Sequence, residues 1–335
     1  MKICVFGAGA VGAHVAARLI DTGDAQVSVV ARGAHLAAIR ERGIRLRSGG
    51  REILARPDAA TDDAGTLPPQ DLVLVGLKAP ALGPSAEAIA RLLAPGAAAV
   101  FMTNGVPWWW WHGAHGAQAL RPPQPLPLLD PDARLWNRVT PARAIGCVLY
   151  SGNEITEPGT VQHTTANEWY FSEPDGMRTD RLTACVALFR AAGFEARVPE
   201  DFRTELWRKL LANAGGNTLG ALTRYSAQSL ALDPDTRELR TRVIAEMLEI
   251  GAALGCDLRA ALDPARMATM GANMPGVRPS MLQDVLAGRP NEVEAIVGQP
   301  LAFARELGVS APALETIVPL LRALDRSVTG RAPAH

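Results

Sequence analysis

The sequence lacks a surplus of charge of either sign. Its 335 residues include 34 Lys and Arg against 34 Asp and Glu, so the formal net charge is zero. Nucleic acids and anionic membranes attract proteins chiefly through excess positive charge. The balance therefore predicts neither of them as a partner. The hydrophobic fraction of 48% and the charged fraction of 20% are typical of an ordinary folded chain.

Long apolar runs and paired cysteines are absent as well. No stretch approaches the roughly 18–20 apolar residues that a membrane-spanning helix needs. The apolar start of the chain runs into a glycine turn without a cleavage-like site, which predicts a cytoplasmic protein without a secretory signal. No CxxC pair occurs, which predicts reduced thiols and no metal cluster. The four cysteines are Cys4, Cys147, Cys185 and Cys256.

Lysine is scarce. Of the 34 basic residues only Lys2, Lys78 and Lys209 are lysines, which leaves 31 arginines. Lysine can release its proton near neutral pH when its surroundings lower its pKa, whereas arginine effectively cannot. The composition is therefore compatible with proton chemistry at a retained lysine, and equally with chance.

Two kinds of segment follow each other along the chain. The first 110 residues alternate strand-like and helix-like stretches, which predicts an α/β fold with a doubly wound parallel sheet of the Rossmann type. From about residue 200 the pattern is helical throughout. We therefore predict an α/β domain over 1–199 and an all-α domain over 200–330. The predicted strands are Lys2–Phe6, Gln26–Val30, 71–77 and 97–102, and the predicted helices include 200–228 and 291–307.

Residues 106–135 form an insertion that is rich in tryptophan and proline. The proline-rich part, 118–131, predicts an extended surface segment. The tryptophan run 108–111 has two interpretations: packing or a subunit interface, and a lid or wall for a larger substrate pocket. His112 and His115 lack the cysteine or acid that would complete a metal site.

A glycine-rich GxGxxG motif follows the first strand and opens a helix. In such motifs the first glycine allows a tight turn, the second admits a pyrophosphate, and the third lets the helix pack on the strand. The free amides at the helix start then bind phosphate. The motif predicts dinucleotide binding through Gly7, Ala8, Gly9, Ala10, Val11 and Gly12.

The end of the second strand predicts which dinucleotide binds. An acidic residue there typically holds the ribose 2′-hydroxyl of NAD. This chain has Arg32 instead, twenty positions after Gly12, with no acid beside it. A guanidinium suits a 2′-phosphate, so we predict NADP(H) as the cofactor. The alternative is a solvated arginine.

Three polar residues share one face of a predicted helix. Lys209, Asn213 and Asn217 are spaced i, i+4, i+8, and apolar residues and two adjacent glycines surround them. The glycines cost helix stability, which indicates close approach of another group. The alternative is a polar patch at a domain seam.

Together these motifs resemble the ketopantoate reductases (2-dehydropantoate 2-reductases), in order and in spacing over nearly the whole chain. The resemblance implies a helical second domain like that of 6-phosphogluconate dehydrogenase and an active site between the two domains. It rests on GAGAVG, Lys78 in GLKAP, Asn104 in TNG, WRKLLANAGGN, Ser280 in SMLQD, and Glu292.

The resemblance also implies roles for individual residues. Lys209 would be the general acid, and Glu292 would bind the substrate hydroxyl. Those that would hold the substrate carboxylate and hydroxyl are Asn213, Asn217 and Ser280. Those that would lie at the nicotinamide end, near cofactor and substrate, are Lys78 and Asn104. The chemistry agrees, because an ammonium stabilises and protonates the oxygen on which charge develops. Taken alone, an acid at 292 could equally support the start of a helix.

We therefore predict NADPH-dependent reduction of ketopantoate to pantoate, on the route to pantothenate and coenzyme A. The expected partner is a small 2-keto acid, and a homodimer is compatible with the sequence. One alternative is a reductase of a bulkier 2-keto acid, motivated by the tryptophan run. The other is an NADP-binding sensor without turnover, which would not need the lysine.

Overall fold

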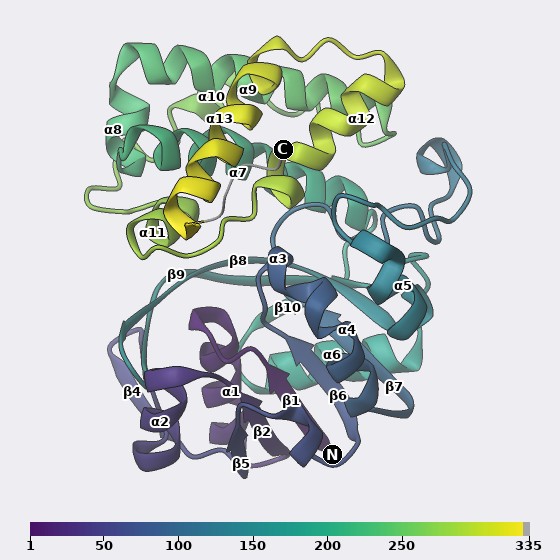
Figure 1. Ribbon diagram of the computed structural model, residues 1–335, viewed down its shortest axis with the longest axis vertical. Helices are drawn as coiled ribbons and strands as arrows, with labels where there is room; N and C mark the ends of the chain where they lie inside the picture. Colours follow the sequence, from purple (N-terminus) through teal and green to yellow (C-terminus); the bar gives the residue numbers. More distant parts are fainter. Residues whose placement is uncertain (331–335) are drawn as a thin grey trace. The chain divides into compact units, whose positions relative to one another are not determined.

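A computed structural model describes residues 1–330 of the chain (Figure 1). These residues divide into two compact units. The first contains residues 1–103, 108–114 and 123–202, and the second contains 104–107, 115–122 and the residues from 203 onward. The short segments 104–107 and 115–122 therefore belong with the helices that follow much later in the chain.

The first unit is built on a ten-stranded sheet in the order β4-β3-β9-β8-β7-β6-β1-β2-β5, with β10 beside β9. Its strands are β1 (Lys2–Phe6), β2 (Gln26–Val30), β3 (Ile44–Ser48), β4 (Arg51–Ala55), β5 (Ala59–Thr61), β6 (Gln70–Val75), β7 (Leu93–Phe101), β8 (Ala144–Glu157), β9 (Thr160–Ser172) and β10 (Glu195–Arg197). Its helices are α1 (Ala10–Thr22), α2 (Gly33–Arg42), α3 (Ala79–Leu82), α4 (Ala86–Leu92), α5 (Arg134–Arg138) and α6 (Asp180–Ala191). Short 3-10 turns lie at Ala64–Thr66, Gly83–Ser85, Pro131–Ala133 and Pro141–Arg143.

The centre of the sheet is parallel, as the alternating pattern predicts. β1 pairs in parallel with β2 and with β6, β6 with β7, and β7 with β8. Two further pairs, β3–β4 and β8–β9, are antiparallel, which the sequence analysis did not predict. Each is joined by a two-residue connection, and connections this short can join only antiparallel neighbours.

Both faces of the sheet are buried. Successive strand residues point to opposite faces, and Ile3 to Phe6 of β1 are all buried. On one face Ile3 and Val5 join a core cluster that includes residues of α1 and α6. On the other face Cys4 is also fully buried, and α4 packs against β6 and β7. Helices on both faces define the doubly wound, Rossmann-type arrangement.

The tryptophan run lies inside the first unit. All four of its indoles are buried, with exposed fractions of 1–3%. Trp108 packs edge-on against Phe101 of β7, and Trp109 stacks on Phe202. These two tryptophans therefore pack as core residues, which is the first of the two interpretations of the run.

The proline-rich stretch is not wholly at the surface, contrary to the prediction. Leu126 and Asp130 are buried, with 4% and 1% exposed. The Asp130 carboxylate accepts the backbone N–H groups of Leu135 and Trp136, each at 2.9 Å. These amides lie at the start of α5, where helix N–H groups otherwise lack partners. The bonds satisfy the carboxylate oxygens and so allow the carboxylate to be buried.

The second unit is helical (Figure 1). It contains α7 (Phe202–Thr223), which begins at the boundary, α8 (Ala227–Leu232), α9 (Pro234–Ala253), α10 (Pro264–Ala268), α11 (Ser280–Leu286), a π-helical turn (Glu294–Gly298), α12 (Gln299–Leu307), α13 (Pro312–Thr329) and a 3-10 turn at Gly116–Gln118. Within residues 1–330, no helix combines the length and apolarity needed to cross a membrane.

Two predicted helices are interrupted. The helix expected over 200–228 ends at Thr223, because Arg224 adopts a positive φ of 66°, which a helix cannot accommodate. The helix expected over 291–307 contains the π-helical turn Glu294–Gly298 before it continues as α12.

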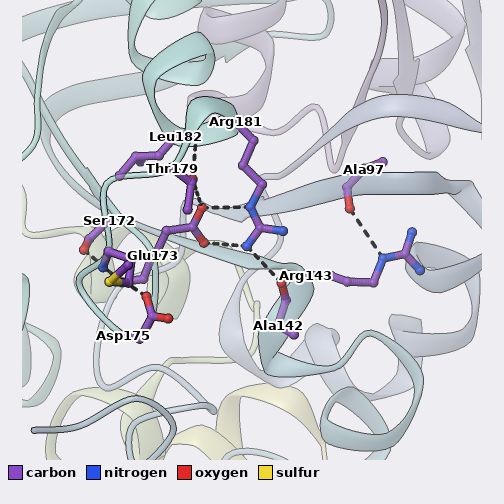
Figure 2. Close-up of polar contacts among 10 residues, drawn as sticks. Ala97, Ala142, Arg143, Ser172, Glu173, Asp175, Thr179, Arg181 and Leu182 are labelled. Atoms are coloured by element: carbon purple, nitrogen blue, oxygen red, sulfur yellow. Dashed lines mark hydrogen bonds and ion pairs between the residues drawn. The ribbon is translucent and has the colours of Figure 1, made fainter.

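A closed polar network joins the end of β9 to α6 (Figure 2). Glu173 is 3% exposed, and both of its carboxylate oxygens accept hydrogen bonds from Arg181, with Nε at 2.7 Å from Oε1. Thr179 donates to the same carboxylate and caps α6 by accepting the N–H of Leu182. The contact with Glu173 raises the pKa of Arg181. The network secures the connection between the hairpin and the helix.

Candidate functional site

The glycine-rich loop has the geometry that its motif predicts. Gly7 has a φ of 98°, a region that favours glycine, and a Cβ there would lie 2.7 Å from Leu77. A Cβ on Gly12 would overlap the Gly7 carbonyl oxygen and lie 3.1 Å from Val5. A Cβ on Gly9 would meet no atom within 4 Å. The first and third glycines are therefore required by packing, and the second faces open space.

Backbone amides are available beside that open space. α1 begins at Ala10 with Gly9 as N-cap, and no side chain of residues 1–330 caps it. The first intrahelical bond runs from Ala13 N–H to the Gly9 carbonyl. The amides of Ala10, Val11 and Gly12 precede that bond and lack intrahelical acceptors. This helix start fits an anionic pyrophosphate.

Arg32 and Lys78 lie at the same edge of the sheet as the glycine loop. The register Val30↔Phe6↔Val75 aligns the ends of β2, β1 and β6, which these residues follow. Arg32 is exposed and is the N-cap residue of α2, while Lys78 is the N-cap of α3. Ligands of doubly wound sheets bind at the carboxyl ends of the strands.

His35 is a residue beside this loop that the sequence analysis did not identify. Its Nδ1 accepts the backbone N–H of Gly159 at 3.0 Å, and its ring also lies against the backbone of Ala8. Burial lowers the pKa of His35. The His35 side chain thus links α2 to the β8–β9 turn. The sequence signal that could have identified His35 is its position three residues after Arg32.

In the second unit, α7 carries the predicted polar face. Lys209 and Asn213 are half-buried and Asn217 is buried. Asn217 Nδ2 donates to Asn213 Oδ1 at 3.3 Å, while the Nδ2 of Asn213 is buried without a partner among residues 1–330. Gly216 shares this face at i+7 from Lys209, and a Cβ there would meet nothing within 4 Å. The face therefore has both unused hydrogen-bonding capacity and free space.

An amide links the lysine to the glutamate in this unit. Lys209 Nζ donates to Asn104 Oδ1 at 2.7 Å, and Asn104 Nδ2 donates to Glu292 Oε2 at 3.3 Å. Glu292 is 6% exposed, and Asn104 is half-buried. The carboxamide thus accepts from the ammonium and donates to the carboxylate, which uses both of its ends. Three of the predicted residues form one chain of hydrogen bonds.

Ser280 lies near the other end of this face but outside the chain of hydrogen bonds. It is exposed at the start of α11, directly after Pro279. A Cβ on Gly220, which is i+11 from Lys209, would lie 2.8 Å from Pro279 Cγ. The glycine therefore allows the start of α11 to approach α7. Ser280 has no hydrogen bond to Asn213 or Asn217 within the described chain.

The cysteines are buried, and none of them forms a disulfide within residues 1–330. Burial raises the pKa of Cys4 to about 12, and burial, then the charge of Glu173, raises that of Cys185 to about 12. Only a thiolate is nucleophilic, and the thiols of Cys4 and Cys185 remain protonated at neutral pH.

The fold and these sites define a class. A Rossmann-type sheet with a GxGxxG loop and a helical unit that presents a lysine, amides and a carboxylate are features of oxidoreductases that act on small substrates.

Comparison with known proteins gives the family. The family model described as "Ketopantoate reductase PanE/ApbA" matches residues 3–176, and "Ketopantoate reductase PanE/ApbA C terminal" matches residues 201–325. A 2-dehydropantoate 2-reductase of Mesorhizobium japonicum is 37% identical over 97% of this chain and 98% of its own length. The chain belongs to the ketopantoate reductase family.

Solved structures agree with this assignment. A candidate ketopantoate reductase from Ralstonia solanacearum MolK2 matches with a TM-score of 0.88 at 32% identity, and the match covers 98% of this chain and 99% of that one. D-mandelate dehydrogenase, solved with NADH and anilino(oxo)acetate, has a TM-score of 0.78 at 18% identity, covering 98% and 99% of the two chains. The second likeness concerns the fold alone.

Proposed function

We propose that this protein catalyses the NADPH-dependent reduction of 2-dehydropantoate to pantoate, a step toward pantothenate and coenzyme A. The observation that carries the proposal is the chain of hydrogen bonds from Lys209 through Asn104 to Glu292. On the same helix face, the Nδ2 of Asn213 has no hydrogen-bond partner among residues 1–330. Membership of the ketopantoate reductase family supports it.

The cofactor site is the glycine loop with Arg32. The amides at the start of α1 hold the pyrophosphate, and the open space beside Gly9 admits it. The guanidinium of Arg32, exposed at the end of β2, binds the 2′-phosphate. Lys78 follows β6 at the same sheet edge, where it contacts the cofactor's nicotinamide end. Bound NADPH supplies the hydride that forms the new C–H bond at the ketone carbon.

Lys209 is the general acid. As the carbonyl π bond breaks, charge develops on the oxygen, and the ammonium stabilises this charge and donates its proton to form the hydroxyl. Asn104 Oδ1, which accepts from Lys209 Nζ at 2.7 Å, orients the ammonium. Solvent returns the proton to Lys209 before the next turnover.

The amides and the glutamate hold the substrate. Asn217 occupies Asn213 Oδ1, so the Asn213 amide keeps its N–H donors for the substrate carboxylate. Ser280, at the start of α11, supplies a further hydroxyl. Glu292 accepts a hydrogen bond from the substrate hydroxyl. The free space above Gly216 leaves room for the small acid.

A substrate panel tests this function against its two alternatives. NADPH oxidation is followed by absorbance with 2-dehydropantoate, with a smaller aliphatic 2-keto acid and with an arylglyoxylate. The proposal expects the highest kcat/KM with 2-dehydropantoate. A higher value with the arylglyoxylate would favour the bulkier substrate, and NADPH binding without turnover of any of them would favour a sensor.

A further inference from the structure

The π-helical turn Glu294–Gly298 leaves one carbonyl without a helical partner. The N–H of Gln299 bonds to the Glu294 carbonyl, five residues earlier, although its α-helical acceptor would be Ala295. The residue five positions after Ala295 is Pro300, which has no N–H to donate. Neither an α-helical nor a π-helical bond is therefore available to the Ala295 carbonyl.

The Ala295 carbonyl instead accepts a hydrogen bond from the loop that follows β7. Ala295 O accepts the backbone N–H of Val106 at 2.8 Å. Gly105, the preceding residue, has a φ of 92°, and a Cβ there would lie 2.6 Å from the Ala295 Cβ. The loop backbone is thus pressed against the turn and bonded to it, at a position where only glycine fits.

The anchored loop carries Asn104. This residue is bonded to Lys209 and Glu292, and Glu292 lies three residues before Ala295. The segment that begins at Glu292 and continues into the π-helical turn therefore carries the carboxylate itself and, through the bond from Val106, holds the loop that carries the bridging amide. An amide displaced by an ångström would no longer orient the ammonium, and misplacement of this size is costly in catalysis.

We propose that Pro300 and the π-helical turn are a positioning device for Asn104. By withholding an N–H from the Ala295 carbonyl, Pro300 keeps that carbonyl free for Val106 and so fixes the amide between Lys209 and Glu292. The inference rests on the proposed function, because it assigns the device to the general acid. Pro300 is a positioning residue and does not touch the substrate.

The test replaces Pro300 by alanine and measures hydrogen exchange at the Val106 amide in the protein without ligands. Pro300→Ala supplies an N–H that can reach the Ala295 carbonyl in the π-helical register, five residues earlier. It also lets the turn relax to a regular helix, in which the Gln299 N–H bonds to that carbonyl. Either donor competes with Val106. We expect at least tenfold faster exchange at Val106, a shifted Asn104 side-chain amide resonance, about tenfold lower kcat and a displaced alkaline limb of the pH–rate profile. The KM for NADPH should not change.

Pro319→Ala is the matched control, because Pro319 is an exposed proline inside α13 of the same unit. It should leave Val106 exchange and kcat unchanged. The proposal is overturned if Val106 exchange in Pro300→Ala equals that of wild type, or if exchange rises while kcat and the pH profile stay fixed.

Two measurements keep the test independent of folding and of turnover. If Pro300→Ala does not fold, wild-type exchange decides: a Val106 amide that exchanges as fast as an unstructured amide overturns the anchor, and a protected one supports it. If wild type reduces no 2-keto acid, the proposed function fails, while the exchange and resonance data still judge the anchor.

Discussion

Glu173 in the first unit and Glu292 in the second are both buried, with 3% and 6% exposed, but their surroundings differ. Glu173 is bound directly and at both oxygens by the guanidinium of Arg181 (Figure 2). Glu292 is linked to the ammonium of Lys209 through the amide of Asn104. In the first arrangement the polar groups bond to one another. The second lies on a helix face where the Nδ2 of Asn213 has no hydrogen-bond partner among residues 1–330.

The difference separates a closed structural network from a face that has hydrogen-bonding capacity left for a ligand. A closed, bidentate pair has no capacity left for a ligand, and breaking it costs stability. A face with an unused buried donor carries a desolvation cost, which a bound polar group would remove. Substitutions in the two regions should therefore affect different measurements.

The largest effect is expected at Lys209. Lys209→Ala should lower kcat roughly 10²–10⁴-fold, the range typical of a lost general acid, with little change in NADPH affinity. Lys209→Arg keeps the charge but should remain impaired, because a guanidinium does not give up its proton. Steady-state kinetics measure both, with Lys2→Ala as the control. A Lys209→Arg enzyme with wild-type kcat would contradict the role.

Glu173→Gln should instead lower stability. Removal of one partner from a buried ion pair costs about 3 kcal/mol, at the low end of the usual range because Arg181 is 34% exposed. Urea unfolding measures the loss. The kcat of the folded enzyme should not change, and a large fall in kcat without a change in stability would remove the contrast between the two glutamates.

Substitution of the exposed Arg32 tests the proposed cofactor site of the first unit. Arg32→Asp replaces attraction by repulsion and should raise the KM for NADPH about ten- to a hundredfold, corresponding to the roughly 1.5–3 kcal/mol of a charge-assisted hydrogen bond. The KM for NADH should hold or improve. Arg40→Asp, on the same helix, is the control. An unchanged NADPH-to-NADH preference would identify Arg32 as a solvated arginine.

His14 allows a test of a second buried polar cluster in the first unit. Its Nε2 accepts from Arg18 Nε at 2.7 Å, and its ring stacks on His163 at 4.6 Å between centroids. Burial, then the charges of His163 and Arg18, lower the pKa of His14 from 6.5 to about 3.

Because the folded pKa is lowered, protons bind the unfolded chain first, and stability falls as pH drops below 6.5 toward 3. The contribution of His14 at pH 5 is a loss of about 2 kcal/mol. Urea unfolding at pH 7 and pH 5 should show this loss in wild type and in exposed His115→Gln, but not in His14→Gln. An identical pH dependence in all three would refute the assignment.

The smallest effect is expected for Glu292→Gln. The amide keeps the shape but accepts a hydrogen bond less strongly, so kcat/KM should fall about tenfold with 2-dehydropantoate, equivalent to about 1.4 kcal/mol. The desoxy analogue, which lacks the hydroxyl, should be affected much less. Equal losses on both substrates would assign Glu292 to helix support.

The glycine loop, the polar face of α7 and the strand β1 could be predicted because each depends on residues close together in the sequence. The turn at Gly7 and the close contact at Gly12 require glycine for local reasons. The loop could therefore be predicted from six consecutive residues. The face of Lys209 and Asn213 follows from helical periodicity alone. The strand β1 is confirmed to the residue because its apolar run is bounded by that same loop.

Only the tertiary structure decided the contacts between distant residues. Asn104 bonds to Lys209 and to Glu292 across 105 and 188 residues, and no periodicity encodes such a separation. The sequence likewise predicts one regular helix over 291–307, whereas the Ala295 carbonyl bonds to Val106. Helices and glycine turns are set by neighbouring residues, but the partner of a freed carbonyl or a buried amide is set by what the fold brings beside it.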